Sequence, residues 1–335
     1  MLSDVWELEE RLSEPTEVAR DVLRETDGDI VVLGAGGKMG PTLTMMLRKA
    51  APDKKVYAVS RFSDREAKAR IERWGVETIT ADLLDESAYR SLPDVPNVFY
   101  LVGMKFGTAD KPPLTWAMNV HLPALVARHY QGMRIVALST GNVYPLVRIA
   151  SGGSREEDIP QPVGEYAQSC LGRERMFEYF SQVHGTLVTL IRLNYANEPR
   201  YGIIVDLTQR ILSGQPIDVT MGAVNLIWQG DANNCILSGL RLAARPPAIV
   251  NVTGPDTIRV RDLATRIGEL LDKPPVFVGQ EADTSLLSNA SRCFEAFGPP
   301  STHLDVMVEW IVAWVAAGKV VLNKPTKYGV RDGKF

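Results

Sequence analysis

Residues 30–40, which read IVVLGAGGKMG, decide the fold of this chain. The first four are a short apolar run of the kind that forms a buried strand. Gly34, Gly37 and Gly40 follow in the spacing GxxGxxG, and residues 41–50 read as a helix that tolerates Pro41 in its first turn. This order predicts a dinucleotide site, because glycine lets the backbone approach a pyrophosphate and the helix N-terminus supplies free N–H donors. A plain tight turn is the alternative.

Strands and helices alternate on either side of this unit. Strands are expected at 56–59, 77–80, 97–102 and 134–139, and helices at 64–74 and 115–130. Such alternation predicts an α/β fold, a Rossmann-type doubly wound parallel sheet covered on both faces. After about residue 195 the alternation weakens, with helices expected at 203–213, 231–244, 260–271 and 303–317 and strands at 216–220 and 249–252.

Three regions follow from this pattern. Residues 1–28 are expected to form an N-terminal helical extension, and residues 29–200 the dinucleotide-binding Rossmann domain. Residues 201–335 are expected to form a smaller, partly discontinuous C-terminal substrate-binding domain.

Composition limits the possible partners. The chain has 335 residues, with 37 Lys and Arg against 40 Asp and Glu, a net charge of −3. So weak a field argues against nucleic acid or an anionic membrane surface as a partner. Three scattered cysteines and four scattered histidines give no metal-ligand cluster. The N-terminal stretch MLSDVWELEE lacks the features of a secretory signal, and Glu309 and Lys319 interrupt the most apolar run, so a cytoplasmic location is expected.

The end of the second strand bears on the type of cofactor. An NAD site usually places Asp or Glu there for the ribose 2′-hydroxyl, whereas an NADP site uses Arg. Here Ser60 takes the place of the acid and Arg61 follows, which favours NADP over NAD. Asp64 is a late candidate for an NAD-type acid, and an ordinary exposed charge is the alternative for Arg61.

Several further motifs occur in a consistent order: TADLL at 80–84, YLVGMK at 100–105, LSTGNVY at 138–144 and EYAQSC at 165–170. Together with the glycine loop they resemble the extended short-chain dehydrogenases/reductases, the NAD(P)-dependent epimerase/dehydratase family, over about residues 29–320. The residues expected to bind the cofactor are Gly34, Gly36, Gly37, Lys38, Met39, Gly40, Ser60, Arg61, Asp82, Leu83, Val102, Gly103, Lys105 and Tyr166.

The resemblance also implies a catalytic set, with one departure from the family pattern. Tyr166 would relay a proton and Thr140 would bond the substrate oxygen, but Cys170 stands where the YxxxK motif has its lysine. A neutral thiol gives no positive charge to lower a phenol pKa near 10. The oxidised nicotinamide ring or Lys105 is the expected source of positive charge, and Arg173 is expected to face elsewhere. A packing role is the alternative for Tyr166.

The same resemblance limits the class of substrate, because two features of the family pattern are missing from this chain. Gly141 and Asn142 follow Thr140 where 4,6-dehydratases carry an acidic pair, which argues against elimination. Residues 225–227 lack the arginine that grips a nucleotide diphosphate, so a nucleotide-diphosphate sugar is not expected. The residues expected to bind the substrate are Asn142, Asn194 and Arg200, and a structural role is expected for Arg192.

These features predict an atypical NAD(P)-dependent oxidoreductase or epimerase that transfers hydride at a hydroxyl or carbonyl carbon of a carbohydrate-like small molecule. The alternative is an inactive NADP(H)-binding sensor or partner-binding module. By the resemblance, helices 115–130 and 166–183 form the interface of a homodimer, although burial within one chain is the alternative. The side chains expected on that surface are Met118, Leu122, Leu125, Met176, Phe177 and Phe180.

Overall fold

The centre of the molecule is a seven-stranded sheet with the strand order β12-β7-β5-β4-β1-β2-β3. This computed structural model describes residues 2–334. All neighbouring strands run parallel, so the Rossmann-type α/β fold is confirmed. The strands are β1 Ile30–Leu33, β2 Val56–Ser60, β3 Glu77–Thr80, β4 Asn97–Tyr100, β5 Arg134–Thr140, β7 Leu187–Leu193 and β12 Ala248–Val252.

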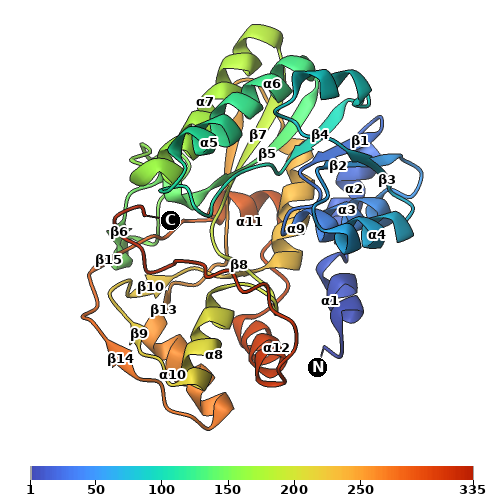
Figure 1. The fold of residues 1–335 in the computed structure, drawn as a ribbon. Helices are drawn as coiled ribbons and strands as arrows, with labels where there is room; N and C mark the ends of the chain where they lie inside the picture. The colour runs from blue at the N-terminus through green and yellow to red at the C-terminus, as the bar shows by residue number, and fades with distance from the viewer. Residues whose placement is uncertain (1, 335) are drawn as a thin grey trace.

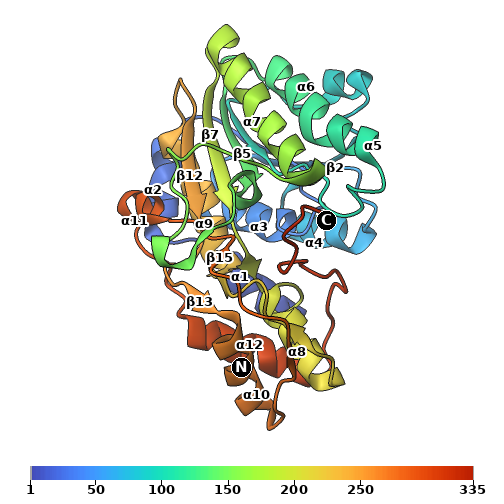
Figure 2. The same ribbon diagram turned by 90° about the vertical axis from the view of Figure 1, so that its left-hand side faces the viewer.

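Both faces of the sheet are covered by helices, as Figures 1 and 2 show. Side chains alternate along a strand, so Ile30 and Val32 join one buried cluster, while Val31 and Leu33 join another. The first face is packed by α2 Glu17–Glu25, α3 Gly40–Ala50, α4 Arg65–Arg73, α9 Gln229–Ser238 and α11 Ser291–Phe297. The second face is packed by α6 Leu122–His129 and α7 Gly164–His184.

A smaller layer lies below the sheet in Figure 1 and has its own apolar core. It contains α8 Ile203–Ser213, α10 Val260–Leu271 and α12 Leu304–Ala316. The first helix, α1 Val5–Leu12, packs into this core through Leu8 and Leu12, whereas α2 packs under the sheet. The N-terminal extension therefore bridges the two parts of the chain.

The remaining elements are short. The paired strands are β6 Val147–Arg148 with β15 Thr284–Ser285, β8 Ala196–Asn197 with β11 Ile227–Trp228, β9 Ile217–Asp218 with β14 Phe277–Val278, and β10 Ala223–Val224 with β13 Ile258–Arg259. Single turns of 3₁₀ helix occur at Gly141–Val143, Ile149–Ser151 and Gly239–Leu242, and a longer one at Glu86–Ser91.

Several expected elements differ from those observed. Strand 249–252 and helix 231–244 were assigned to the substrate region, but β12 is a strand of the main sheet and α9 packs on it. The helix expected at 115–130 is divided into α5 Pro112–Trp116, a π-helical turn at Ala117–His121, and α6. Asn119 explains the turn, because its amide bonds both backbone groups of Met104 and fixes the helix to the loop after β4.

The irregular stretch after α12 is here called the C-terminal segment (residues 319–334). It runs back from α12 towards the ends of the sheet strands, near β6 and β15 (Figure 1). Leu322 donates its N–H to the Arg200 carbonyl at 2.9 Å. Thr326 donates both its N–H and its hydroxyl to Asp206 on α8, at 2.8 and 2.6 Å. Arg331 then bonds the Thr284 carbonyl at 2.8 Å. The segment is therefore held in place by specific polar contacts along its length.

Within residues 2–334, no helix combines the length and apolarity needed to cross a membrane. The described side chains likewise include no group of three His, Cys, Asp or Glu residues able to hold a metal ion.

Candidate active site

A cavity of about 390 Å³ opens at the carboxyl ends of β1, β4, β5 and β7. A second one, of about 190 Å³, continues it past the ends of β2 and β3, and both are lined by Gly34, Gly37 and Gly103. Strand order reverses between β1 and β4, and ligands of open α/β sheets bind at such a switch point. Tyr201 from the smaller layer and Lys324 from the C-terminal segment line the opposite wall of the larger cavity.

The glycine loop lies between the two cavities. A Cβ on Gly40 would come within 2.3 Å of the Ala35 carbonyl oxygen, and Gly34 has φ +88°, so both positions need glycine. A Cβ on Gly37 would meet the Gly34 oxygen at 3.2 Å and otherwise face open space. Among the described residues no side chain caps the start of α3, so its first N–H groups are available to an anion.

The smaller cavity has the composition of a nucleoside site. Ser60, Arg61, Asp82, Leu83 and Val102 all line it. Gly36 is required here, because a Cβ would lie 2.7 Å from the Ser60 hydroxyl oxygen.

Asp64, the candidate NAD-type acid, lines neither cavity. Its carboxylate instead caps α4, where it accepts the N–H groups of Glu66 and Ala67 at 2.9 and 3.1 Å.

At the larger cavity, the end of β5 meets the first turn of α7. Thr140 Oγ1 accepts hydrogen bonds from the Asn142 N–H at 3.2 Å and from Asn142 Nδ2 at 3.0 Å. Tyr166 lines the same cavity as Thr140, and the side chains of Thr140 and Cys170 both influence its pKa. Burial, reinforced by Cys170, raises the pKa of Tyr166 well above its usual value, so the phenol is protonated at neutral pH.

Arg173 also lines the larger cavity, which corrects the expectation that it faces elsewhere. Residues three apart on a helix share a face, so Arg173 lies on the same side of α7 as Cys170. Its guanidinium donates to the Leu138 carbonyl at 2.7 Å and to Asn119 Oδ1 at 2.8 Å. Its charge opposes the rise in the Tyr166 pKa. Arg173 thus supplies a cation beside the phenol.

Lys105 lies in the larger cavity with its Nζ 6.0 Å from the centre of the Tyr166 ring. The pKa of Lys105 is lowered to about 8, mainly by burial and to a smaller extent by Lys327, while Cys170 and Asp206 oppose the shift. Near pH 8 this lysine is therefore divided between its charged and neutral forms.

Lys38 leaves the glycine loop and points towards the smaller layer, with its Nζ 3.7 Å from the centre of the Tyr201 ring. Burial lowers the pKa of Lys38 to about 7. Glu198 opposes this shift, and Lys105 and Arg200 add to it.

Asn194, at the end of β7, is one of the residues expected to bind substrate. Its side chain is 1% exposed and lines the larger cavity. Its Nδ2 group has no hydrogen-bond partner in the part of the chain that the structure describes. A buried amide donor at a cavity wall is costly to leave unpaired, and a bound ligand is the natural acceptor.

Solved structures share the fold of this chain, although no protein-family model matches the chain and no curated protein matches it in sequence. UDP-glucose 4-epimerase from Thermotoga maritima is 18% identical, with a TM-score of 0.73 over 87% of this chain and 99% of the other. UDP-glucuronic acid 4-epimerase from Bacillus cereus, in complex with UDP-glucuronic acid and NAD, is 15% identical, with a TM-score of 0.73 over 86% and 99%. An epimerase from Methanothermobacter thermautotrophicus is 20% identical, with a TM-score of 0.72 over 91% and 97%.

The chain therefore has the fold of these epimerases. Within that fold, all fourteen residues expected to bind the cofactor line one or other cavity. Thr140, Asn142 and Asn194 line the larger cavity as well. Their roles in binding and catalysis remain predictions.

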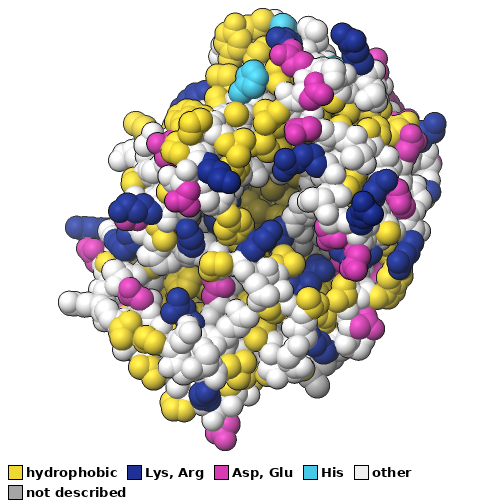
Figure 3. Space-filling model, in the orientation of Figure 1, with side chains coloured by type: hydrophobic (Ala, Val, Ile, Leu, Met, Phe, Trp, Pro, Cys, Tyr) yellow, Lys and Arg dark blue, Asp and Glu magenta, His cyan; other side chains and the backbone are white. Residues whose placement is uncertain are grey.

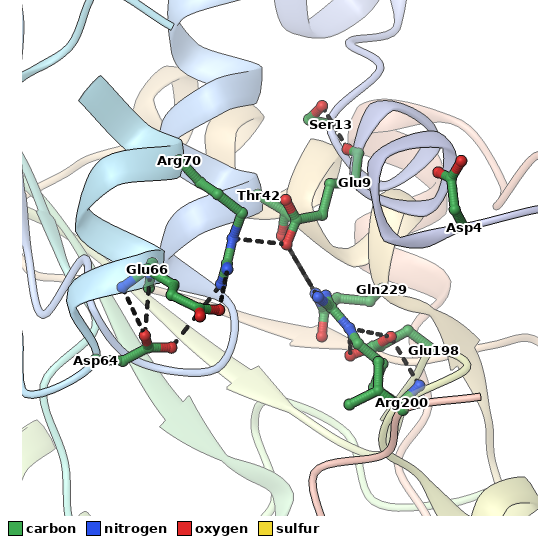
Figure 4. A network of polar contacts seen from close by, with 12 residues as sticks. Asp4, Glu9, Ser13, Thr42, Asp64, Glu66, Arg70, Glu198, Arg200 and Gln229 are labelled. Carbon is green, nitrogen blue, oxygen red and sulfur yellow. Dashed lines mark hydrogen bonds and ion pairs between the residues drawn. The ribbon is translucent and has the colours of Figure 1, made fainter. Parts of the chain in front are cut away.

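Arg200 is the exception among the expected site residues, because it does not line either of these cavities. Figure 4 shows its guanidinium between Glu198 and Glu9. It bonds both oxygens of Glu198 at 3.1 Å and Glu9 Oε1 at 2.9 Å. Arg70 on α4 also pairs with Glu9. Two carboxylates already neutralise Arg200, so its guanidinium is not presented to the larger cavity.

Arg173 and Lys324 are two charged residues of the larger cavity that were not among the expected site residues. Helical spacing from Cys170 is a signal that finds Arg173. Lys324 lies in an irregular segment more than 100 residues from α8, which anchors it, and local spacing gives no signal for such a contact.

Proposed function

We propose that this chain is an NAD(P)-dependent oxidoreductase or epimerase that transfers hydride at a hydroxyl or carbonyl carbon of a carbohydrate-like substrate. One observation carries the proposal. Tyr166 and Thr140 line one cavity that continues to the glycine loop. Bound nicotinamide would supply the hydride, and the two hydroxyls would hold the substrate oxygen. The shared fold with sugar epimerases supports the assignment.

The protonation state of Tyr166 favours one direction of reaction. A phenol with a raised pKa is a proton donor at neutral pH and a poor base. Tyr166 would therefore give its proton to a substrate oxygen as a carbonyl is reduced. Because Thr140 accepts two hydrogen bonds from Asn142, its own proton is directed away from that residue, towards Tyr166 or the substrate.

For the cofactor we propose NADP ahead of NAD. Arg61 is exposed at the smaller cavity, where it could pair with a 2′-phosphate. Asp64 is already used as a helix cap. The Bacillus cereus neighbour contains NAD, so NAD is the alternative. Titration of the purified chain with NADPH and NADH, followed by nicotinamide fluorescence, tests the assignment: tight binding of either supports the dinucleotide site, and the tighter one identifies the cofactor.

The variant Gly37→Ala is expected to weaken dinucleotide binding at least tenfold. Its added methyl group would lie where the backbone approaches the pyrophosphate, and tenfold corresponds to about 1.4 kcal/mol. The same fluorescence titration measures the change. Gly329→Ala is the matched control, because its Cβ would meet nothing within 4 Å. Equal affinities for the two variants would argue against phosphate binding at the loop.

Dinucleotide affinity is expected to fall about three- to tenfold from pH 6.5 to about pH 9. A lysine is cationic below its pKa, and the pKa values of Lys38 and Lys105 are about 7 and about 8. Raising the pH through this window therefore removes positive charge that attracts phosphate. Titrations across the range measure the slope, and Lys38→Met should flatten it while exposed Lys334→Met should not. A flat profile for the wild-type chain would contradict this assignment of charge.

We further propose a substrate without a nucleotide diphosphate, although the neighbours named above include UDP-sugar epimerases. Two observations support this. Asn225 and Leu226 stand where an arginine would be expected, and both are buried. The Asn225 side chain donates to the Asp256 carbonyl at 3.0 Å and accepts the Ser288 N–H at 2.9 Å. Comparing UDP-glucose with free sugars in a binding assay separates the two substrate classes.

A binding module that performs no hydride transfer is the second candidate. Cys170 in place of the lysine favours it, because the thiol and burial both raise the pKa of Tyr166. Such a module would bind the dinucleotide without ever oxidising or reducing it.

A homodimer through α5, α6 and α7 also remains a proposal. Leu122, Leu125 and Phe177 are buried within the chain itself. Their burial supports a packing role inside one chain, and not a place at the dimer interface, for these three side chains. Trp116, Tyr179 and Val183 on the same helices are exposed.

A further inference from the structure

The wall of the larger cavity opposite the sheet contains a lysine from the C-terminal segment. Lys324 lines this cavity, with its Nζ 5.9 Å from the centre of the Phe106 ring across the opening. The segment reaches this place because Leu322 is bonded to Arg200 and Thr326 to Asp206 on either side of Lys324. The hydrogen bonds at Leu322 and Thr326 therefore fix the backbone on both sides of Lys324 and place its ammonium group at the cavity.

The cavity is strongly one-sided in charge. Lys38, Lys105, Arg173 and Lys324 line it, and no Asp or Glu among the described residues does. The two nearby carboxylates already have hydrogen-bond partners outside the cavity lining or at its rim. Glu198 accepts a hydrogen bond from Arg200, and Asp206 accepts one from Thr326. Figure 3 shows Lys and Arg side chains around a hollow in this face of the molecule. Burying positive charge in excess is unfavourable unless an anion balances it.

The cofactor accounts for part of this charge. The pyrophosphate belongs at the start of α3, next to the backbone of Lys38. Arg173 is held by a carbonyl and by Asn119. Lys105 and Lys324 come from the loop after β4 and from the chain end, outside the glycine loop. The unpaired donor of Asn194 lines the same cavity. Lys324 and the Asn194 amide are therefore candidates to bind a second ligand, with Lys105 in the same cavity.

Resting on the proposed function, we propose that Lys324 and Lys105, with Asn194, bind an anionic group of the substrate, so that the substrate is an acidic sugar. The shared chemistry is a carboxylate or a phosphate ester, either of which accepts charge-assisted hydrogen bonds from ammonium groups. Lys324 would then act as a specificity-determining residue from the C-terminal segment. The lowered pKa of Lys105 agrees with this, because such a lysine gains stability when an anion joins it.

The test is calorimetric titration of the full chain, with and without saturating NADP or NAD, using D-glucose, D-gluconate, D-glucuronate and D-glucose 6-phosphate. At least one anionic probe is expected to bind ten times more tightly than glucose. Lys324→Gln should remove about tenfold of that preference, Lys324→Arg should keep most of it, and both should leave dinucleotide affinity unchanged. Lys334→Gln is the matched control, since Lys334 lies in the same segment and is exposed.

The outcomes separate the subsite from the proposed function. If a dinucleotide binds but the anionic probes bind no better than glucose, or Lys324→Gln leaves their preference unchanged, the subsite is wrong and the oxidoreductase proposal stands. If neither dinucleotide binds while the ligand-free chain holds an anionic probe through Lys324, the proposed function is wrong and the subsite stands. The tighter of the carboxylate and phosphate probes identifies the anion.

Discussion

Replacing Tyr166 with phenylalanine is expected to lower the rate of hydride transfer by about 10²- to 10⁴-fold, the usual contribution of a positioned acid or base. The variant keeps the ring in the cavity that Thr140 also lines and removes only the phenolic hydroxyl. Substrate oxygen would then lose its proton donor, while the glycine loop and its backbone donors stay as they are. Dinucleotide affinity should therefore remain within about twofold of the wild type.

The rate is measured from nicotinamide absorbance with whichever acidic sugar binds most tightly, at saturating cofactor. Tyr179→Phe is the matched control, because Tyr179 lies on the same helix and its side chain is 56% exposed. Turnover by Tyr166→Phe at the wild-type rate would remove Tyr166 from the mechanism. Cofactor binding without turnover by the wild-type chain, across the sugars tested, would favour the binding module.

Local patterns are enough to select the residues expected to bind the cofactor, and these residues line the two cavities. An apolar strand, a glycine loop and a helix start occur within eleven residues, so Gly34, Gly37 and Gly40 identify the turn without tertiary information. Ser60 and Asp82 follow the next strands, and parallel strands all end at the same edge of a sheet. The position of each of these residues therefore follows from its place at the end of a strand, and in the structure all five line the two cavities.

The substrate half depends on contacts between distant segments. Arg200 was expected to meet an anionic substrate, but Glu9, 191 positions away, takes its guanidinium. Lys324 reaches the cavity because Thr326 bonds Asp206, 120 positions away. Neither pairing follows from spacing or periodicity. Arg173 is different, because its position three residues after Cys170 places it on the cavity face of the same helix.

Glu174→Gln is expected to lower the free energy of unfolding by about 3 to 5 kcal/mol, because it leaves the charge of Arg192 buried without a counter-charge. Glu174 and Arg192 are 0% and 2% exposed and are joined through Arg192 Nε and NH2, at 3.0 and 2.7 Å. Urea denaturation measures the change. Glu178→Gln, which breaks the exposed Arg175 pair one turn further along α7, should cost less than about 1 kcal/mol. Equal losses for the two variants would contradict the buried-pair argument.

Glu174→Gln is also expected to disturb the position of Thr140 in the candidate active site, because the Glu174–Arg192 ion pair contacts the end of β5. Ser139, next to Thr140, donates its hydroxyl to Glu174 Oε1 at 2.5 Å. Arg192 in turn holds the Tyr144 hydroxyl at 2.7 Å, and Tyr144 holds Asn251 on β12 at 2.9 Å. One carboxylate thus links the end of β5 to α7, β7 and β12. In folded Glu174→Gln protein, turnover should fall further than dinucleotide affinity, since the network positions Thr140 and leaves the glycine loop untouched.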